Sequence, residues 1–308
     1  GGSEPAAFVD VATSPAGIVF VASEQTLYCI DDSDVYEVQS LDPSALPDAA
    51  EEPSLAAVAV DVDGAPLAIE HLNPRVLRLV DGGFEIVAGS DEPAIGGSRS
   101  ATVGPDGTIY MTGLGPSGST FVWAIRGGTP EPFAGTGPNG TAGDGGPALD
   151  ANFYEPEGLA APSDGSLLVA DRNNQRVVRI GPDGVVETLA GGRRFDDRPD
   201  SEALEAPSDV AVDLDGEVLV LERPPSADGP PGIYRIVAPD EVELVLGSDG
   251  YCEPEIEAGA SEACAAQEYD ADDLYRFDVA ADGSYWLVHT SAILRFSDGK
   301  VEAILAIS

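Results

Sequence analysis

The sequence predicts an all-β protein built from one repeated four-stranded unit, and three observations support this prediction. Short β-type runs alternate with tight turns, and Asp-Gly between such runs is a strong hairpin signal. The pattern returns six times along the 308 residues. No long segment has a helical period, and only residues 43–57 could hold a helical turn.

The clearest unit is the stretch EGLAAPSDGSLLVADRNNQRVVRIGPDGVVETLAG, from Glu157 to Gly191. Its four β-type runs are GLAAP, SLLVAD, RVVRI and VVETLAG. Tight turns, SDG and PDG, join the first run to the second and the third to the fourth. A longer polar loop joins the middle two runs, so the unit predicts an up-and-down four-stranded sheet.

Six such sheets arranged radially form a six-bladed β-propeller with four antiparallel strands per blade, which is the predicted fold. We expect one domain over residues 1–308, with blades at about 7–41, 55–90, 99–136, 155–191, 206–247 and 274–307. The first copy begins with a first strand and the last copy ends with a fourth. Each blade is therefore expected to be contiguous in sequence.

The glycine-rich stretch AGTGPNGTAGDGGPALDANF, residues 134–153, has two rival interpretations. A phosphate-binding loop of the Walker type requires a lysine after the glycines, and none follows. A calcium loop requires acidic or amide side chains at alternate positions and a glutamate, whereas Asp144 stands nearly alone. The stretch is therefore interpreted as the crossover between the third and fourth blades.

Residues Tyr154 to Gly191 resemble an NHL repeat. The lead-in AGTG…GDGGPA, the centre VADRNNQRVVRI and the following Asp-Gly carry the resemblance. It implies a six-bladed NHL-type propeller over essentially the whole chain. It also implies that Asp171 and Arg176, which bracket the loop after the second strand, form a recurring structural pair. Glu70 and Arg75 repeat this spacing in the second blade.

The charge of the chain restricts its partners. Acidic residues outnumber basic ones 55 to 15, which gives a net charge of −40. Phosphate backbones and anionic membrane surfaces require a basic face, so we expect neither nucleic-acid binding nor binding to such a membrane. No apolar run is long enough to span a bilayer, so no membrane insertion by this segment is expected.

The positions of the three cysteines indicate the cellular compartment in which the protein is expected. Cys252 and Cys264 lie close together in a polar stretch, and we expect a loop-closing disulfide between them. Cys29 lies in an apolar run and is expected to be a lone, partly buried thiol. A disulfide implies an oxidising compartment, so the expected location is extracellular, periplasmic or at the cell surface.

The loops divide unequally between the two faces of the predicted propeller. The turns between first and second strands and between third and fourth strands are tight. The other connections hold nearly all the long insertions, and long loops on a rigid scaffold concentrate function. The loop-rich face is therefore the expected ligand-binding face, with these candidate residues: Phe153, Tyr154, Arg172, Asn173, Asn174, Arg193, Arg194, Phe195, Arg198 and Tyr251.

Enzymatic alternatives find little support in the sequence. NHL-type peptidyl-hydroxyglycine lyases need a zinc ion held by several histidines, and this chain has only His71 and His289. No nucleophile motif accompanies these histidines. No catalytic residue, metal ligand or cofactor is therefore predicted.

Lactonase-type propellers hold a divalent ion with carboxylates in the central channel. The predicted first strands carry mostly small apolar residues. The exceptions are Asp10 and Asp278 early in their strands, and Asp61 and Asp213 at the turns. If a channel metal were present, Asp10 and Asp278 would be its first candidates.

The sequence favours a non-catalytic extracytoplasmic recognition module that binds a protein, peptide or glycan through the loop-rich face. NHL-type propellers also serve as sensor ectodomains of bacterial membrane receptors such as Ser/Thr kinases, so the resemblance allows that role. Gly1-Gly2-Ser3 has the look of an added tag, which is compatible with an upstream leader or membrane domain. The alternative is a metal-dependent lactonase or lyase.

Overall fold

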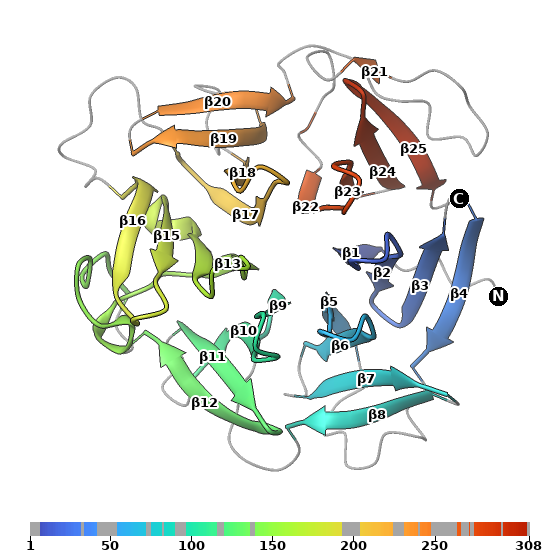
Figure 1. The fold of residues 1–308 in the computed structure, drawn as a ribbon, viewed down its shortest axis with the longest axis horizontal. Coiled ribbons are helices and arrows are strands. Elements are labelled where there is room, and N and C mark those ends of the chain that lie inside the picture. The colour runs from blue at the N-terminus through green and yellow to red at the C-terminus, as the bar shows by residue number, and fades with distance from the viewer. Residues whose placement is uncertain are drawn as a thin grey trace.

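Six antiparallel sheets surround a central axis in the computed structural model, each with four successive strands as predicted (Figure 1). The structure describes residues 7–31, 34–41, 54–71, 75–81, 83–89, 97–115, 120–135, 139–192, 204–223, 231–239, 241–247, 264–265, 271, 274–290 and 292–306.

Blades 1 to 3 follow one another along the chain, each running from an inner strand near the axis to an outer strand. Blade 1 contains β1 (Phe8–Thr13), β2 (Val19–Ser23), β3 (Thr26–Asp31) and β4 (Asp34–Ser40). Blade 2 contains β5 (Leu55–Val60), β6 (Pro66–Glu70), β7 (Val76–Val80) and β8 (Gly83–Ala88). Blade 3 contains β9 (Ala101–Val103), β10 (Ile109–Leu114), β11 (Thr120–Arg126) and β12 (Thr129–Ala134).

Blades 4 to 6 continue the same arrangement. Blade 4 contains β13 (Pro156–Ala160), β14 (Leu167–Asp171), β15 (Arg176–Ile180) and β16 (Val186–Gly191). Blade 5 contains β17 (Pro207–Val212), β18 (Val218–Glu222), β19 (Gly232–Ala238) and β20 (Glu241–Leu246). Blade 6 contains β22 (Leu274–Val279), β23 (Tyr285–His289), β24 (Ala292–Ser297) and β25 (Lys300–Ala306), with the short edge strand β21 (Cys264–Ala265).

The ring closes by contact between blade 6 and blade 1, whose inner strands β22 and β1 lie side by side (Figure 1). Each blade is contiguous in sequence, since the four main strands of every described sheet follow chain order. The blades are held together by apolar packing: an apolar cluster fills each of the six interfaces between neighbouring blades.

Strand alternation explains how one blade contributes to two of these clusters. In β14, Leu167 and Val169 pack toward blade 3, whereas Leu168 and Ala170 pack toward blade 5. Successive side chains of a strand point to opposite faces of the sheet, and both faces are covered here. The central strands therefore read as continuous apolar runs rather than as alternating apolar and polar residues.

The glycine-rich stretch connects β12 of blade 3 to β13 of blade 4, as predicted, and includes the short 3-10 helix η1 (Ala148–Asp150). Its Ala148, Ala151 and Phe153 belong to the apolar cluster between these blades. Gly143 has a φ of +110°, and a Cβ there would lie 2.5 Å from Ala151 Cα. The positive φ and the close approach of Ala151 thus both require glycine at this position.

The predicted structural pairs are formed and buried. Arg176 Nε donates to Asp171 Oδ2 at 2.8 Å in blade 4. Arg75 Nη2 donates to Glu70 Oε1 at 2.9 Å in blade 2. In both blades the pair joins the end of the second strand to the beginning of the third.

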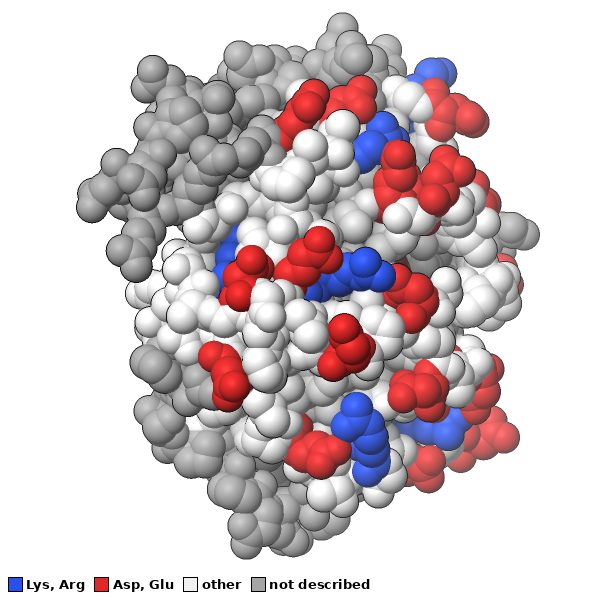
Figure 2. All heavy atoms as spheres, turned by 60° about the vertical axis from the view of Figure 1, so that its left-hand side comes forward, with Lys and Arg blue, Asp and Glu red and all other residues white. Residues whose placement is uncertain are grey.

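The surface carries the acidic excess. Figure 2 shows acidic side chains spread over one side of the ring, with basic side chains interleaved among them. This pattern fits a solvated acidic surface rather than a single acidic site. No helix of the described residues is long and apolar enough to cross a membrane.

Several sequence-based expectations concern residues outside the described ranges. They include the candidate ligand residues Arg193, Arg194, Phe195, Arg198 and Tyr251, together with Cys252. The disulfide between Cys252 and Cys264 therefore stays a prediction. Cys29 is a free, partly buried thiol.

Candidate functional site

Five of the six inner strands have a register irregularity near their beginnings, and it helps to identify equivalent residues around the channel. The pairing is irregular between the first and third residues of β1, β5, β17 and β22, and between Pro156 and Leu159 of β13. A bulge places an extra residue on one strand and redirects side chains. The third-position residues of blades 1 to 6 are Asp10, Ala57, Ser100, Gly158, Asp209 and Arg276.

Three aspartates, of which Asp10 and Asp209 are buried and Asp278 is partly buried, join neighbouring inner strands that belong to separate sheets. Asp10 Oδ2 accepts the N–H of Val58 in blade 2 at 2.9 Å. Asp209 Oδ2 accepts the N–H of Phe277 in blade 6 at 2.9 Å. In each case the other carboxylate oxygen accepts the N–H of the following residue, at 2.9 Å and 3.0 Å.

Asp278 makes the corresponding connection from blade 6 to blade 1. Its Oδ2 accepts the N–H of Thr13 at 2.7 Å, and its Oδ1 accepts the N–H of Val279 at 2.8 Å. Asp278 lies two positions further along its strand than Asp10 does along β1, and Arg276 occupies the position equivalent to Asp10. The two aspartates expected at the same early position therefore lie at different depths.

These contacts argue against a metal held by the channel carboxylates. Asp10, Asp209 and Asp278 each use both oxygens on main-chain N–H groups. Asp61 and Asp213 lie at the turns, as expected, where each accepts main-chain N–H groups of its own turn. Among the described residues, no group of three His, Cys, Asp or Glu side chains could hold a metal ion. The described residues do not fit such a centre.

Burial of the channel acids makes stability depend on pH. Burial raises the pKa of Asp10 from 3.8 to about 8 and that of Asp209 to about 6, although the nearby Arg276 opposes both shifts. Between about pH 4 and its folded pKa, each of these groups therefore holds a proton that the unfolded chain has lost. Stability from these groups is complete below about pH 4 and declines as the pH rises through their folded pKa values.

We expect the wild-type melting temperature to fall between pH 6 and pH 9, and Asp10→Asn to flatten this slope. The asparagine cannot ionise, so it loses the linked proton while retaining one hydrogen-bond acceptor. Scanning calorimetry of both proteins across this range provides the measurement. Equal slopes would show that Asp10 does not carry the effect.

The two mouths of the channel differ in charge. The mouth on the tight-turn face opens a cavity of about 420 Å³ whose charged lining residues are all acidic: Asp10, Asp61, Asp209 and Asp278. The mouth on the loop-rich face opens a cavity of about 520 Å³ with these ionisable side chains: Arg99, Arg172, Arg223, Arg276, Glu24, Glu157, His71 and Tyr275. The basic side chains thus gather at one end of the channel, in a chain of net charge −40.

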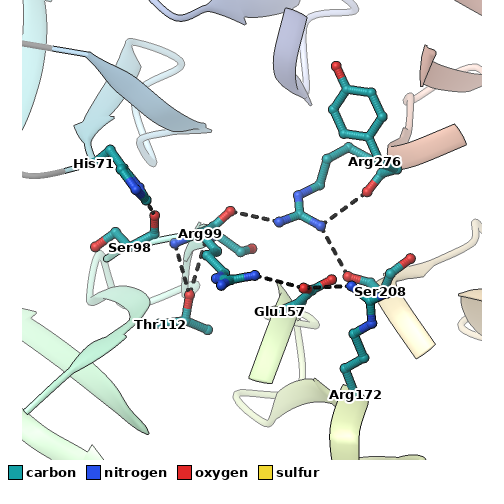
Figure 3. Close-up of polar contacts among 10 residues, drawn as sticks. His71, Ser98, Arg99, Thr112, Glu157, Arg172, Ser208 and Arg276 are labelled. Carbon is teal, nitrogen blue, oxygen red and sulfur yellow. Dashed lines mark hydrogen bonds and ion pairs between the residues drawn. The ribbon is translucent and has the colours of Figure 1, made fainter. Parts of the chain in front are cut away.

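Arg276 crosses the channel between these mouths. Its buried guanidinium extends from blade 6 and donates Nη2 to the carbonyl of Arg99 in blade 3, on the opposite side of the ring, at 2.8 Å (Figure 3). Nη1 donates to the carbonyls of Ser208 in blade 5 and of Tyr275, both at 3.1 Å. One cation therefore forms the floor of the basic mouth.

Arg99 and Arg172 approach each other above this floor. Their Nη1 atoms both donate to Glu157 Oε1, at 3.0 Å and 2.8 Å (Figure 3). The Glu157 side chain is nearly buried, whereas those of Arg99 and Arg172 are 50% and 31% exposed. His71 lies at the rim with Nδ1 3.0 Å from the carbonyl of Ser98. The shared carboxylate thus holds two guanidinium groups facing the cavity.

The candidates predicted from the sequence occupy different environments. Arg172 lies in the basic mouth, and the next residue, Asn173, is exposed. Tyr154 is also exposed, and its carbonyl accepts the N–H of Asn173 at 3.1 Å. Phe153 is 1% exposed and packs between blades 3 and 4, so it offers no contact surface. Asn174 is buried and donates to the carbonyl of Gly140 at 2.6 Å, holding the crossover.

Sequence reasoning missed Arg99, Glu157 and Arg276. The signal was available in the first strands of the blades, which begin FVD, LAA, SRS, PEG, PSD and LYR. Aligning these triplets places Arg99 and Glu157 at the second position and Arg276 at the third. Both positions surround the channel at its loop-rich end.

Comparisons with known proteins agree with this architecture. The sequence model of the NHL repeat matches residues 153–180. No curated protein matches the chain significantly in sequence. The chain is thus a six-bladed β-propeller that carries an NHL repeat in its fourth blade.

Solved structures share the fold at low sequence identity. Virginiamycin B lyase from Staphylococcus aureus is 17% identical with a TM-score of 0.57, covering 96% of this chain and 83% of that one. A chain of a nidogen/laminin complex is 12% identical with a TM-score of 0.59, covering 91% and 89%. A gluconolactonase from Xanthomonas campestris is 14% identical with a TM-score of 0.55, covering 86% and 84%. At these identities the likeness concerns the fold alone.

Proposed function

We propose that this chain is a non-catalytic recognition module that binds a protein, peptide or glycan through its loop-rich face, with the ligand centred on the basic mouth. The contrast between the two mouths carries the proposal. Four arginines line the mouth on the loop-rich face, whereas the charged residues that line the other mouth are all acidic. Concave sites with a few converging polar groups are the usual places for ligands.

The contacts of the channel residues favour recognition over catalysis. The channel aspartates connect strands, and Arg276 is held by main-chain carbonyls. The lyase and the gluconolactonase share the fold, which makes a metal-dependent lactonase or lyase the alternative. That alternative would need ligands from outside the described residues, because no suitable group exists within them.

An extracytoplasmic location is part of the proposal. A disulfide between Cys252 and Cys264 would require an oxidising compartment. A sensor ectodomain of a bacterial membrane receptor would fit such a location and a ligand-binding face. Mass measurement of the purified chain, two hydrogens lighter than the fully reduced sequence, would support the disulfide.

Peptide and glycan arrays test the recognition role. The wild-type chain should retain at least one class of ligand, and Arg99→Glu should abolish its retention by reversing the charge at the mouth. Arg126→Glu is the matched control, because Arg126 is also about half-exposed and paired with one glutamate, but lies at the turn between β11 and β12. Equal loss in both variants, or no retained ligand, would contradict the proposal.

A further inference from the structure

We propose that the basic mouth binds a carboxylate group of a peptide ligand, with Arg99 and Arg172 as the principal contacts. The inference rests on the proposed recognition role and specifies the chemistry of its ligand. It depends on the placement of guanidinium groups, the charge balance of the cavity and the acidity of the surrounding surface.

Arg99 and Arg172 are partly exposed and are held in place by Glu157, but most of their guanidinium N–H donors have no partner among the described residues. Each donates one Nη1 hydrogen to Glu157, and no other side-chain hydrogen bond is made by either guanidinium among the described residues. A guanidinium has five N–H donors, so Nε and Nη2 of both groups are available to a ligand. Because Glu157 is nearly buried and fixes both side chains, little rotamer freedom is lost when a ligand binds.

The charge balance of the mouth favours an anion. Four arginines line the cavity against two glutamates, Glu24 and Glu157. One of these positive charges, the buried guanidinium of Arg276, lies at the floor of the same cavity. An anion that enters the mouth therefore meets more positive than negative side chains.

The rest of the molecule restricts the anion to a single small group. The chain carries a net charge of −40, and acids are spread over the side of the ring that Figure 2 shows, so an extended polyanion would be repelled away from the mouth. A carboxylate at the end of a ligand or on one side chain meets only the arginines. Planar carboxylates also match the forked guanidinium geometry in two parallel hydrogen bonds.

A peptide fits the lining better than an acidic sugar does. Sugar rings commonly stack on exposed aromatic faces, and Tyr275 is the one aromatic side chain that lines the described part of the mouth. Its hydroxyl donates to the carbonyl of Phe8, which fixes the ring at the channel wall. The mouth therefore offers guanidinium donors rather than a stacking platform.

The test is an NMR titration of the arginine Nε–Hε signals with N-acetyl-alanyl-glycine, using its C-terminal amide for comparison. The free acid should shift the signals of Arg99 and Arg172 in a saturable manner, and the amide should not. Arg99→Gln and Arg172→Gln should each weaken binding by about tenfold or more, since charge-assisted hydrogen bonds are lost. Arg126→Gln should leave binding unchanged.

Other probes separate the carboxylate from competing anions. A galacturonic acid dimer or inorganic phosphate that binds more tightly than the peptide acid would overturn the peptide assignment. Equal shifts with acid and amide, no saturable shift, or equal weakening in Arg126→Gln would overturn the carboxylate site. Using both mouth variants guards against a folding defect in one of them.

The outcomes also separate this inference from the recognition role. An array ligand whose retention depends on Arg99, combined with no preference for the free acid, would refute the carboxylate site and leave the recognition role intact. A saturable carboxylate site in a chain that retains no array ligand would refute the recognition role alone.

Discussion

Replacing Arg176 with methionine is expected to lower the free energy of unfolding by about 3–5 kcal/mol, because the change leaves Asp171 buried without its cationic partner. Arg176 is 1% exposed, and its guanidinium makes three hydrogen bonds. Nε donates to Asp171, Nη1 to the carbonyl of Thr141 at 3.0 Å, and Nη2 to the carbonyl of Asn152 at 2.9 Å. The last two contacts attach the glycine-rich crossover to blade 4.

Urea unfolding monitored by circular dichroism measures this effect. Arg179→Met is the matched control, since Arg179 lies on the same strand and pairs with Asp164, but both side chains are more than a third exposed. An exposed pair is typically worth less than about 1 kcal/mol. Similar losses in the two variants would show that burial of the Asp171–Arg176 pair does not determine its contribution.

The same pair shows what the sequence can predict. Its two residues lie five apart in the chain and bracket one loop, so local spacing alone brings them together. Turn residues are equally local: Asp164 Oδ1 accepts the N–H of Ser166 at 2.9 Å, and Gly165 supplies a φ of +82°. Because every blade repeats such local signals, the propeller and its strand order follow from the sequence.

The candidate site could not be predicted in the same way, because it depends on contacts between blades. Arg276 reaches the carbonyl of Arg99, 177 residues away, and only ring closure brings them together. Arg276 is also buried, whereas arginine usually lies at the surface. A prediction based on exposed arginines therefore favours the loops over the channel. Asp10, Asp209 and Arg276 follow the same register irregularity in their strands, so the sequence can align them, but only the closed ring shows that this position surrounds the channel.

Replacing Gly158 with alanine is expected to destabilise the fold by about 2–4 kcal/mol, through overpacking and loss of a hydrogen bond between blades. A Cβ at this position would lie 2.5 Å from both Cα and Oδ1 of Asp209. Relief requires the inner strand of blade 5 to move away from blade 4. Such movement disturbs the bond from Phe277 N–H to Asp209, and Glu157, next to Gly158, would shift with the arginines that it holds.

The sign of the change in the free energy of unfolding shows whether a Cβ on residue 158 conflicts with Asp209. Where alanine fits, a change from glycine stabilises a protein by about 0.4–1 kcal/mol, because the unfolded chain loses freedom. Ala57 already occupies the equivalent position in blade 2, where it is buried without conflict. Ala57→Gly, the reciprocal control, should therefore cost only about 1 kcal/mol. If Gly158→Ala stabilised the protein, the added methyl group would fit between blades 4 and 5, and the expected overpacking would be refuted. If it weakened ligand binding at the basic mouth without lowering the free energy of unfolding, the substitution would act through Glu157.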